Sequence, residues 1–462
     1  MKRLGALAAV SATVAALSVW GGACGSSNSA SPASDGDAFD RAPRDAGVAR
    51  SDSATTPAED AALASDAPVS TALPDGDWEP VTSAAPCRLS AARMPPDPFP
   101  PRTWASCGPG CRVADAWPGQ PTTSALVVGS GGACTHGESY VYLGSDGQPE
   151  TVAVSRMSDG ATVAAVRIDA TDGACVFSGF GGDAPFLFSV FEEDAGLFFG
   201  RASAEAGAPV AWQSGWVANG PAAFVSRFMF DEGHGVVSST GQVAWLPSSA
   251  AGAFTTLESS LSPVDYASGR GHLLVWNRND GQHGWITSFV ADGGAPAVLF
   301  AAPTGTLINV ARATDDRVVW LSVTGPQASQ FVYAGARIDW VTYTATPGGL
   351  VTQSQRPGPV LSAPTGLYDL AAGDDYAATI GCDANPDPAA QICRVYVARL
   401  STGKVWAVPQ RPGGNSFRRV LAIGASEVVL AEQDARPAAI QSAFKRIVRI
   451  AIDQLDAVVA AW

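Results

Sequence analysis

An all-β fold class is predicted by three observations on this chain of 462 residues. Short runs rich in valine, tryptophan, tyrosine and threonine recur along most of the chain, and these residue types favour strands. The 49 glycines and 33 prolines exceed their usual share and supply the turns that many short strands need. Several of the strand-like runs fall in windows that align with one another, which indicates an internal repeat.

The chain begins with a segment that predicts export. Two basic residues precede an apolar run over residues 4–20, and the small residues Gly22 and Ala23 then precede Cys24. This order of basic, apolar and small residues describes a secretory signal. The segment resembles the lipobox of bacterial lipoproteins, in which small residues precede an invariant cysteine. The resemblance implies cleavage after residue 23 and a lipid on Cys24. The alternative is an ordinary signal peptide with a coincidental cysteine.

The residue after Cys24 and the composition of the next segment predict how the protein is held. Gly25 follows the cysteine, and by resemblance to enteric sorting rules this favours the outer membrane over the inner. Residues 24–75 are mostly alanine, serine, aspartate and proline, which cannot bury enough apolar surface to fold. We therefore expect a signal peptide over 1–23, a disordered tether over 24–75, and a cysteine-containing extension over 76–119.

Four windows of eleven residues carry the repeat. Each has an apolar residue, an alanine, a small residue two positions on, a polar turn and an apolar strand. Their starts lie 44, 60 and 51 residues apart, and a further pair of strands with a glycine turn follows three of them. A unit of about 50 residues with several strands has the size of a propeller blade. The windows are residues 266–276, 310–320, 370–380 and 421–431.

Weaker copies of the repeat at residues 126–128, 186–188 and 235–237 raise the number of starts to seven. The sequence therefore predicts a single seven-bladed β-propeller over residues 120–462, with six or eight blades, or two or three stacked β-sandwiches, as alternatives. The pattern resembles bacterial extracytoplasmic propellers with irregular blades. We expect residues 446–452 or 458–462 to complete the last sheet, or to pair near 125–128 and close the ring.

Export permits disulfides, and the cysteine positions suggest partners. Cys382 and Cys393 follow and precede strand-like runs, so a bond between them would clamp a hairpin loop. Cys107 and Cys111 can close a small loop, or either can pair with Cys87. A zinc site is the weaker interpretation, because the spacing of four ligands is absent. The disulfide candidates are Cys382, Cys393, Cys134, Cys175, Cys107 and Cys111.

The charged residues argue against nucleic-acid binding. The formal charge is −14, and only three lysines occur in the chain, so no basic patch is available to neutralise phosphates. No serine-hydrolase elbow or phosphate-binding loop occurs either. Residues 277–285 loosely resemble the aspartate box of sialidase propellers, and we interpret them as a hairpin turn. Residues 383–387 resemble half of a calcium loop, and a loose surface site is the alternative to a plain loop.

These observations predict no catalytic residues, no metal and no cofactor. The favoured function is a membrane-anchored envelope lipoprotein whose propeller is a non-catalytic binder or scaffold for a protein or polysaccharide. The alternative is a propeller enzyme, a hydrolase or lyase, that acts on extracellular glycans with acids drawn from several blades. Carboxylates or arginines that converge at one mouth of the central channel would favour the enzyme, whereas an apolar or plugged channel would favour the binder.

Overall fold

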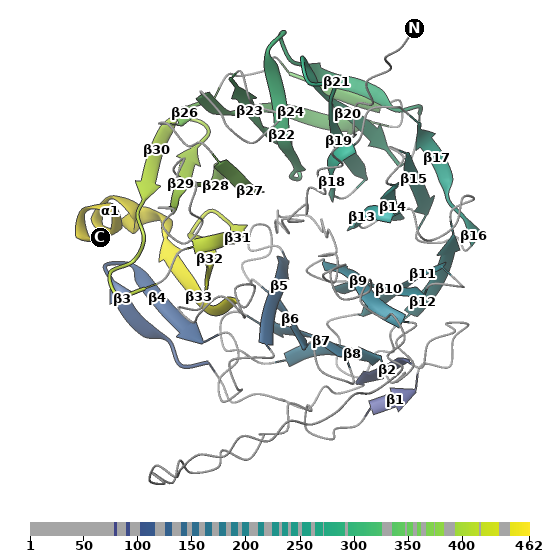
Figure 1. Ribbon diagram of the computed structural model, residues 1–462, viewed down its shortest axis with the longest axis horizontal. Coiled ribbons are helices and arrows are strands. Elements are labelled where there is room, and N and C mark those ends of the chain that lie inside the picture. Colours follow the sequence, from purple (N-terminus) through teal and green to yellow (C-terminus); the bar gives the residue numbers. More distant parts are fainter. Residues whose placement is uncertain are drawn as a thin grey trace, which may run out of the picture.

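Seven β-sheets surround one central axis in the computed structural model, which describes residues 78–80, 89–92, 102–115 and, with further gaps, 125–462 (Figure 1). Within each sheet the strands follow one another from the axis outward, as in the blades of a propeller. The prediction of a single seven-bladed β-propeller is therefore confirmed. The expected signal peptide, the tether and the proposed lipid site Cys24 lie outside the described residues.

Blades 1 and 2 combine local strands with strands from elsewhere in the chain, whereas blade 3 is built from its own stretch of chain. Blade 1 contains, from the axis outward, β5 (Ala125–Gly131), β6 (Tyr140–Ser145), β7 (Glu150–Arg156), β8 (Thr162–Ile168), β2 (Leu89–Ala92) and β1 (Trp78–Pro80). Blade 2 contains β9 (Cys175–Gly181), β10 (Phe186–Glu192), β11 (Gly196–Ala202), β12 (Ala211–Trp216) and β16 (Gly252–Ala253). Blade 3 contains β13 (Phe224–Phe230), β14 (Gly233–Ser238), β15 (Val243–Pro247) and β17 (Thr255–Glu258).

Blades 4 to 6 are built from consecutive strands. Blade 4 contains β18 (Val264–Arg270), β19 (Leu273–Asn279), β20 (Gly284–Val290) and β21 (Ala297–Ala301). Blade 5 contains β22 (Thr306–Ala313), β23 (Arg317–Thr324), β24 (Gly335–Thr346) and β25 (Gly349–Thr352), and β26 (Val360–Leu361) pairs with β24. Blade 6 contains β27 (Gly366–Ala372), β28 (Tyr376–Cys382), β29 (Cys393–Arg399) and β30 (Lys404–Val408).

Blade 7 combines strands from the N-terminal and C-terminal parts of the described chain. It contains β31 (Phe417–Ile423), β32 (Glu427–Gln433), β33 (Phe444–Ala451), β4 (Cys111–Asp115) and β3 (Ala105–Gly108). β33 pairs with β32 on one side and with β4 on the other, so a strand from the N-terminal part closes the ring. A 3-10 turn, η5 (Ile452–Gln454), and helix α1 (Leu455–Ala461) follow β33 and lie on the outer rim (Figure 1).

The pairing of β33 shows which of the predictions for residues 446–462 are right. Of the segment 446–452, residues 446–451 lie in β33 and do complete the last sheet. Of the segment 458–462, residues 458–461 belong to helix α1 and not to a strand, and Trp462 caps the helix. The pairing with residues 125–128 was wrong, because those residues lie in β5, the innermost strand of blade 1. Strands β1 to β4 come from the segment 76–119 and belong to blades 1 and 7. The propeller therefore begins earlier in the chain than residue 120.

The repeat windows correspond to one local structure. In blades 4 to 7 each window covers the end of the first strand, the turn after it and the second strand. The alanine and the small residue let the first strands approach one another near the axis, while the apolar second strand packs between neighbouring blades. The weaker copies at 186–188 and 235–237 lie in β10 and β14, which are the second strands of blades 2 and 3 and not the first strands. Each copy still marks a separate blade, so the predicted number of blades was right.

Two of the expected disulfides are present. Cys382 and Cys393 face each other across β28 and β29 and are bonded. Cys107 and Cys111 are bonded at the β3–β4 turn. The backbone of Cys175 lies in β9, whereas Cys87 and Cys134 lie outside the described residues. In the described ranges no helix has the length and apolar character to cross a membrane.

Candidate functional site

The two faces of the ring differ in the length of their connections. On one face the first and second strands of blades 5, 6 and 7 are joined by three residues each, at 314–316, 373–375 and 424–426. On the other face the second and third strands of the same blades are separated by ten residues each: 325–334, 383–392 and 434–443. We name these the tight-turn face and the long-connection face. Binding residues of proteins concentrate on longer connections held by a rigid scaffold.

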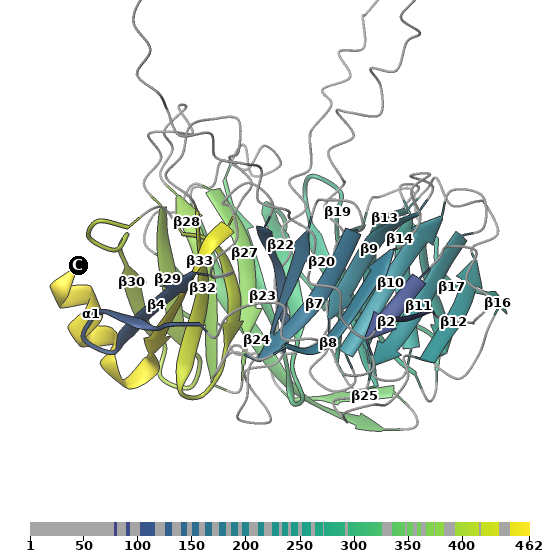
Figure 2. The same ribbon diagram turned by 90° about the horizontal axis from the view of Figure 1, so that it is seen from below.

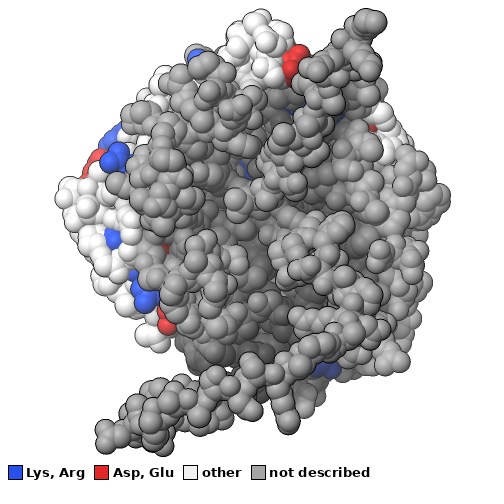
Figure 3. Space-filling view, viewed as in Figure 1, with Lys and Arg blue, Asp and Glu red and all other residues white. Residues whose placement is uncertain are grey.

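The long-connection face is the upper side of the ring in Figure 2, and it faces the viewer in Figure 3. In Figure 3 the acidic and basic side chains of the described residues are seen around the rim of this face. In Figure 2 the hairpin of β24 and β25 projects from the opposite side, below the blades.

The hairpin turn predicted at 277–285 is the β19–β20 turn of blade 4, and it lies on the long-connection face. Asp280 Oδ1 accepts hydrogen bonds from the backbone N–H groups of Gln282, at 2.8 Å, and His283, at 2.7 Å. Gly281 adopts a φ of +87°, which favours glycine. The two backbone hydrogen bonds are the largest cause of a lowered pKa for Asp280, so its carboxylate is ionised at neutral pH.

Two asparagines connect this hairpin to the first strand of blade 5. The Asn279 side chain accepts from Ile308 N and donates to Ile308 O, both at 2.8 Å, as a neighbouring strand would. Buried Asn277 donates to the same carbonyl oxygen at 3.0 Å. A Cβ atom on Gly284 would lie 2.5 Å from Ile308 N, so the close approach of the two blades requires glycine there.

A histidine joins the hairpin to the connection between blades 4 and 5. His283 Nε2 lies 2.9 Å from Thr304 Oγ1, and His283 Nδ1 lies 3.4 Å from Asp280 Oδ2. His283 and Asp280 are 43% and 39% exposed, so the group is accessible from solvent. We name these three residues the Asp280–His283–Thr304 relay. The order of acid, imidazole and hydroxyl is one that supports proton transfer.

Sequence reasoning found only half of this group. It identified the hairpin that carries Asp280 and His283, but it assigned them no role. The hydroxyl partner, Thr304, is 21 residues further along the chain from His283. It meets the histidine only because the connection out of blade 4 returns to the same end of the ring. The Asp-x-x-His spacing within a short hairpin was the one local signal that could have drawn attention to the group.

Ion pairs join neighbouring blades at the tight-turn face. Arg270, at the end of β18, contacts Asp315 in the turn of blade 5, with an Nε–Oδ1 distance of 2.6 Å. Arg317 of blade 5 lies 3.7 Å from Asp375 in the corresponding turn of blade 6. Arg399 also binds Asp375, at 2.9 Å. The carboxylate of one turn is therefore held by an arginine of the preceding blade, which fixes the angle between the blades.

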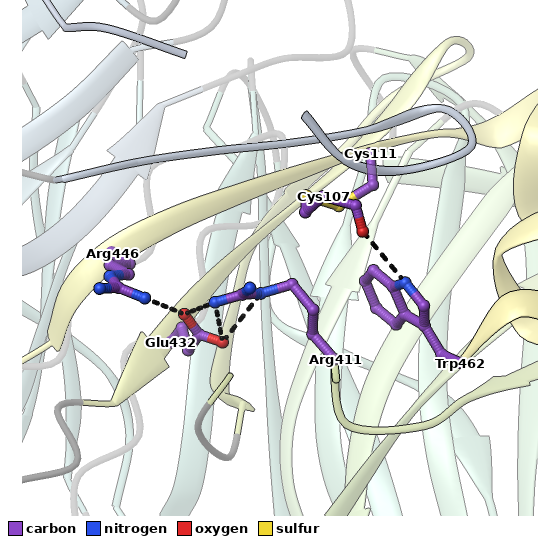
Figure 4. Close-up of a disulfide and its surroundings, with 6 residues drawn as sticks. All are labelled: Cys107, Cys111, Arg411, Glu432, Arg446 and Trp462. Carbon is purple, nitrogen blue, oxygen red and sulfur yellow. Dashed lines mark hydrogen bonds and ion pairs between the residues drawn. A yellow bond between two sulfur atoms is a disulfide. The ribbon is translucent and has the colours of Figure 1, made fainter. Parts of the chain in front are cut away.

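Two further acids pair with arginines away from this face. Glu258 of β17 binds Arg278 of β19 at 2.9 Å and so joins blades 3 and 4. Glu432 of β32 is fully buried and accepts from Arg411, which lies in the connection from blade 6, at 3.0 Å (Figure 4). Arg446 Nη1 approaches the same carboxylate at 4.0 Å.

The four acids Glu258, Asp315, Asp375 and Glu432 belong to four different blades and lie at separate blade boundaries. They do not form the carboxylate pair that a glycosidase places on either side of one bond. The calcium-like segment 383–387 lies outside the described residues. Within the described ranges no cluster of histidine, cysteine and acidic side chains is arranged to hold a metal ion.

The two ends of the ring also meet through side chains (Figure 4). The indole N–H of Trp462, at the end of the chain, donates to the Cys107 carbonyl oxygen at 3.3 Å. Trp462 also stacks on Phe417 of β31, with ring centroids 6.2 Å apart. Asp456 of α1 binds Lys404 of β30 at 2.8 Å. The helix therefore rests against the outer strands of blades 6 and 7.

No protein-family model matches the chain, and no curated protein matches it in sequence. Solved structures resemble it in fold only. An oligogalacturonate lyase in complex with manganese is 12% identical with a TM-score of 0.45, covering 77% of this chain and 98% of its own. The computationally designed Ika8 protein is 11% identical with a TM-score of 0.40, covering 70% and 96%.

The β-propeller domain of Nup133 from Vanderwaltozyma polyspora is 6% identical with a TM-score of 0.37, covering 76% of this chain and 99% of its own. The similar structures thus include a lyase, a computationally designed protein and the β-propeller domain of Nup133. At these identities the likeness concerns the shape of the ring and says nothing about activity. The chain is a seven-bladed β-propeller, and its function must be argued from its own residues.

Proposed function

We propose that this protein is an exported, lipid-anchored component of the bacterial cell envelope whose propeller is a binding platform. The N-terminal pattern that ends at Cys24 supports export and attachment to a membrane, with the outer membrane favoured. The bonds Cys107–Cys111 and Cys382–Cys393 support an oxidising compartment, because disulfides persist there.

The observation that carries the binding role is the set of three ten-residue connections on one face. They follow the second strands of three consecutive blades, while the opposite face has turns of three residues. A ring clamped by inter-blade ion pairs and closed by β4 and β33 supplies a rigid base for them. The Cys382–Cys393 bond joins the two strand ends between which one of these connections runs.

The composition of these connections indicates a neutral partner. Segment 325–334 contains no charged residue, 383–392 contains two aspartates, and 434–443 contains one acid and one arginine. Amide side chains both donate and accept hydrogen bonds, and aromatic rings stack on apolar sugar faces. We therefore propose an uncharged envelope polysaccharide as the partner. The side chains suited to it are Gln327, Gln330, Phe331, Tyr333, Gln391 and Gln441.

The binding role is tested by shortening one connection. Residues 325–334 are replaced by Asn-Gly, which forms a two-residue hairpin turn and leaves β23 and β24 in place. Sedimentation with a purified neutral envelope polysaccharide should show saturable binding by the chain with Cys24→Ser, and binding at least tenfold weaker by the shortened variant. A matched control, Ala425→Lys on the tight-turn face, should bind normally.

Equal binding by the shortened variant would overturn the assignment of this face. Binding that disappears in 0.5 M salt would mean that a charged partner, such as a protein, is recognised instead. Release of new reducing ends from the polysaccharide would favour the alternative of a glycan-degrading enzyme.

The anchor is tested separately by labelling cells with a radioactive fatty acid. The wild-type chain should carry the label and fractionate with membranes, because the thiol of Cys24 is the attachment point. The Cys24→Ser chain should be unlabelled and soluble. Equal labelling of the two chains would contradict the lipoprotein assignment.

A further inference from the structure

We propose that Asp280, His283 and Thr304 form a hydrolytic site for small acyl esters on the long-connection face. This activity goes beyond the binding role and does not depend on it. The three residues come from the β19–β20 hairpin and from the connection between blades 4 and 5. They lie on the face that the three ten-residue connections share.

The geometry matches the order of groups that activates a hydroxyl nucleophile. Thr304 Oγ1 lies 2.9 Å from His283 Nε2, within the reach of direct proton transfer. His283 Nδ1 lies 3.4 Å from Asp280 Oδ2, a distance that is long in a resting site and shortens when the imidazole becomes charged. Such constellations recur on unrelated folds and are recognised by their geometry and not by chain position.

Asp280 is positioned to select the productive state of the histidine. Its Oδ1 atom is fixed by two backbone N–H groups, so Oδ2 is left to accept a hydrogen bond from His283 Nδ1. A neutral imidazole protonated at Nδ1 presents Nε2 as an acceptor toward the Thr304 hydroxyl. The lowered pKa of Asp280 keeps the carboxylate ionised, which stabilises the imidazolium formed during reaction.

The backbone around Thr304 leaves one amide for the developing oxyanion. Gly305 N donates to Gln282 O, and Thr306 N donates to Pro303 O. The backbone N–H of Thr304, which lies between Pro303 and Gly305 in the chain, donates to no group in the described ranges. Thr304 is exposed in a turn with Gly305 at a φ of +83°, so a substrate carbonyl can approach both its hydroxyl and its amide.

The reaction has two balanced steps. Thr304 Oγ1 attacks the ester carbonyl carbon while His283 Nε2 takes the hydroxyl proton. The bond from that carbon to the alcohol oxygen then breaks, and His283 returns the proton to the departing alkoxide, which leaves an acyl-threonine. Water attacks this ester with His283 as base. The carboxylic acid leaves, the proton returns to Oγ1, and no further reactant is consumed.

The exposure of the group sets the expected rate. Because His283 and Asp280 are about two-fifths exposed, water screens the charges that form, and one amide stabilises the oxyanion where two are usual. We therefore expect slow hydrolysis of short, activated esters. The rate should exceed that of the uncatalysed reaction in buffer by about 10²-fold, which is the low end for general-base catalysis.

The test uses p-nitrophenyl acetate and the purified full chain with Cys24→Ser. Thr304→Ala and His283→Gln should each lower kcat/KM at least tenfold, and Thr304→Ser should restore it. Asp280→Asn retains an oxygen for the two backbone N–H groups of the turn but removes the charge, so it should lower kcat while the chain melts normally. His272→Gln alters another exposed histidine, on the tight-turn face, and should leave the rate unchanged.

A further measurement separates catalysis from a structural role. Peptide mass spectrometry of the chain quenched during turnover should find an acetyl group on Thr304. Unchanged hydrolysis by folded Thr304→Ala, or acetylation only elsewhere, would overturn the proposal. Polysaccharide binding is measured without the ester, so its failure is distinguishable from failure of the hydrolytic site.

Discussion

Removal of residues 445–462 should unfold the whole ring, because this segment supplies nearly all of β33, which pairs with a strand on each side in blade 7. β33 lies between β32 and β4, and without it the β3–β4 hairpin has no strand of blade 7 to pair with among the described residues. Six aliphatic side chains of the segment are fully or almost fully buried: Ile447, Val448, Ile450, Ile452, Leu455 and Val458. At about 1.5–3 kcal/mol each, their burial contributes roughly 9–18 kcal/mol.

That contribution is as large as the entire net stability of a typical domain, about 5–15 kcal/mol. Thermal unfolding followed by near-ultraviolet circular dichroism should therefore show a cooperative transition for the full chain and none for the truncated one. Leu455→Ala provides a graded version, because it removes one buried side chain at a cost of about 2–5 kcal/mol. With an unfolding entropy of about 0.7 kcal/mol per kelvin for a propeller of this size, its melting temperature should fall by about 3–7 °C.

Ala460→Ser, at an exposed position of α1, is the matched control and should melt with the wild type. A truncated chain that melts within about two degrees of the full chain would refute closure of the ring through β33. A normal Leu455→Ala chain beside an unfolded truncated chain would mean that β33 alone closes the ring and that α1 adds little.

Three further perturbations test other contacts. Gly284→Ala should lower the melting temperature well beyond Gly403→Ala, because a Cβ atom at Gly284 would lie 2.5 Å from a backbone nitrogen of the next blade. Gly403→Ala meets no atom and is strained only by its φ of +71°, at about 1 kcal/mol, so equal losses would contradict the close approach at Gly284. Replacing both Cys382 and Cys393 by serine should lower the free energy of unfolding by about 2–3 kcal/mol and loosen blade 6. Amide hydrogen exchange in β28 and β29 should become faster, and unchanged exchange there would contradict the prediction. Burial alone would raise the pKa of Asp375, but hydrogen bonds from neighbouring groups outweigh it and lower the pKa, so the ionised carboxylate stabilises the fold. This stabilisation is complete above the unfolded pKa of about 3.9 and is lost as pH falls through the folded pKa. The melting temperature should therefore fall less steeply below about pH 4 in Asp375→Asn than in the wild type, and an equal fall in the two chains would refute this.

Local pattern was enough to predict the strands and the number of blades. The four windows mark the same hairpin in blades 4 to 7 because the first turn of a blade is short and its second strand is buried on both faces. In blades 2 and 3 the first strands β9 and β13 lack the alanine and small-residue pattern. The weaker copies were therefore found in the second strands, β10 and β14. Periodicity along the chain finds hairpins but does not say which strand of a hairpin is innermost.

Contacts between distant segments could not be predicted in the same way. The pairing of β4 with β33 joins residues that are more than 300 positions apart, and nothing in either strand specifies the other. The inter-blade pair Arg270–Asp315 and the His283–Thr304 contact are also set by the angle between blades. By contrast, Cys382 and Cys393 could be paired from sequence, because they flank one hairpin.

The position of β3 and β4 has a consequence for how the protein is made. These strands emerge early in synthesis, but their partner β33 follows after more than 300 further residues. At about 5–20 residues per second, that interval lasts on the order of 15–70 s. During it β4 has an open edge that can pair with another chain, a known route to aggregation. A chain that is cut or stalled before residue 444 never acquires the partner of β4, so the ring can close only after synthesis has passed β33.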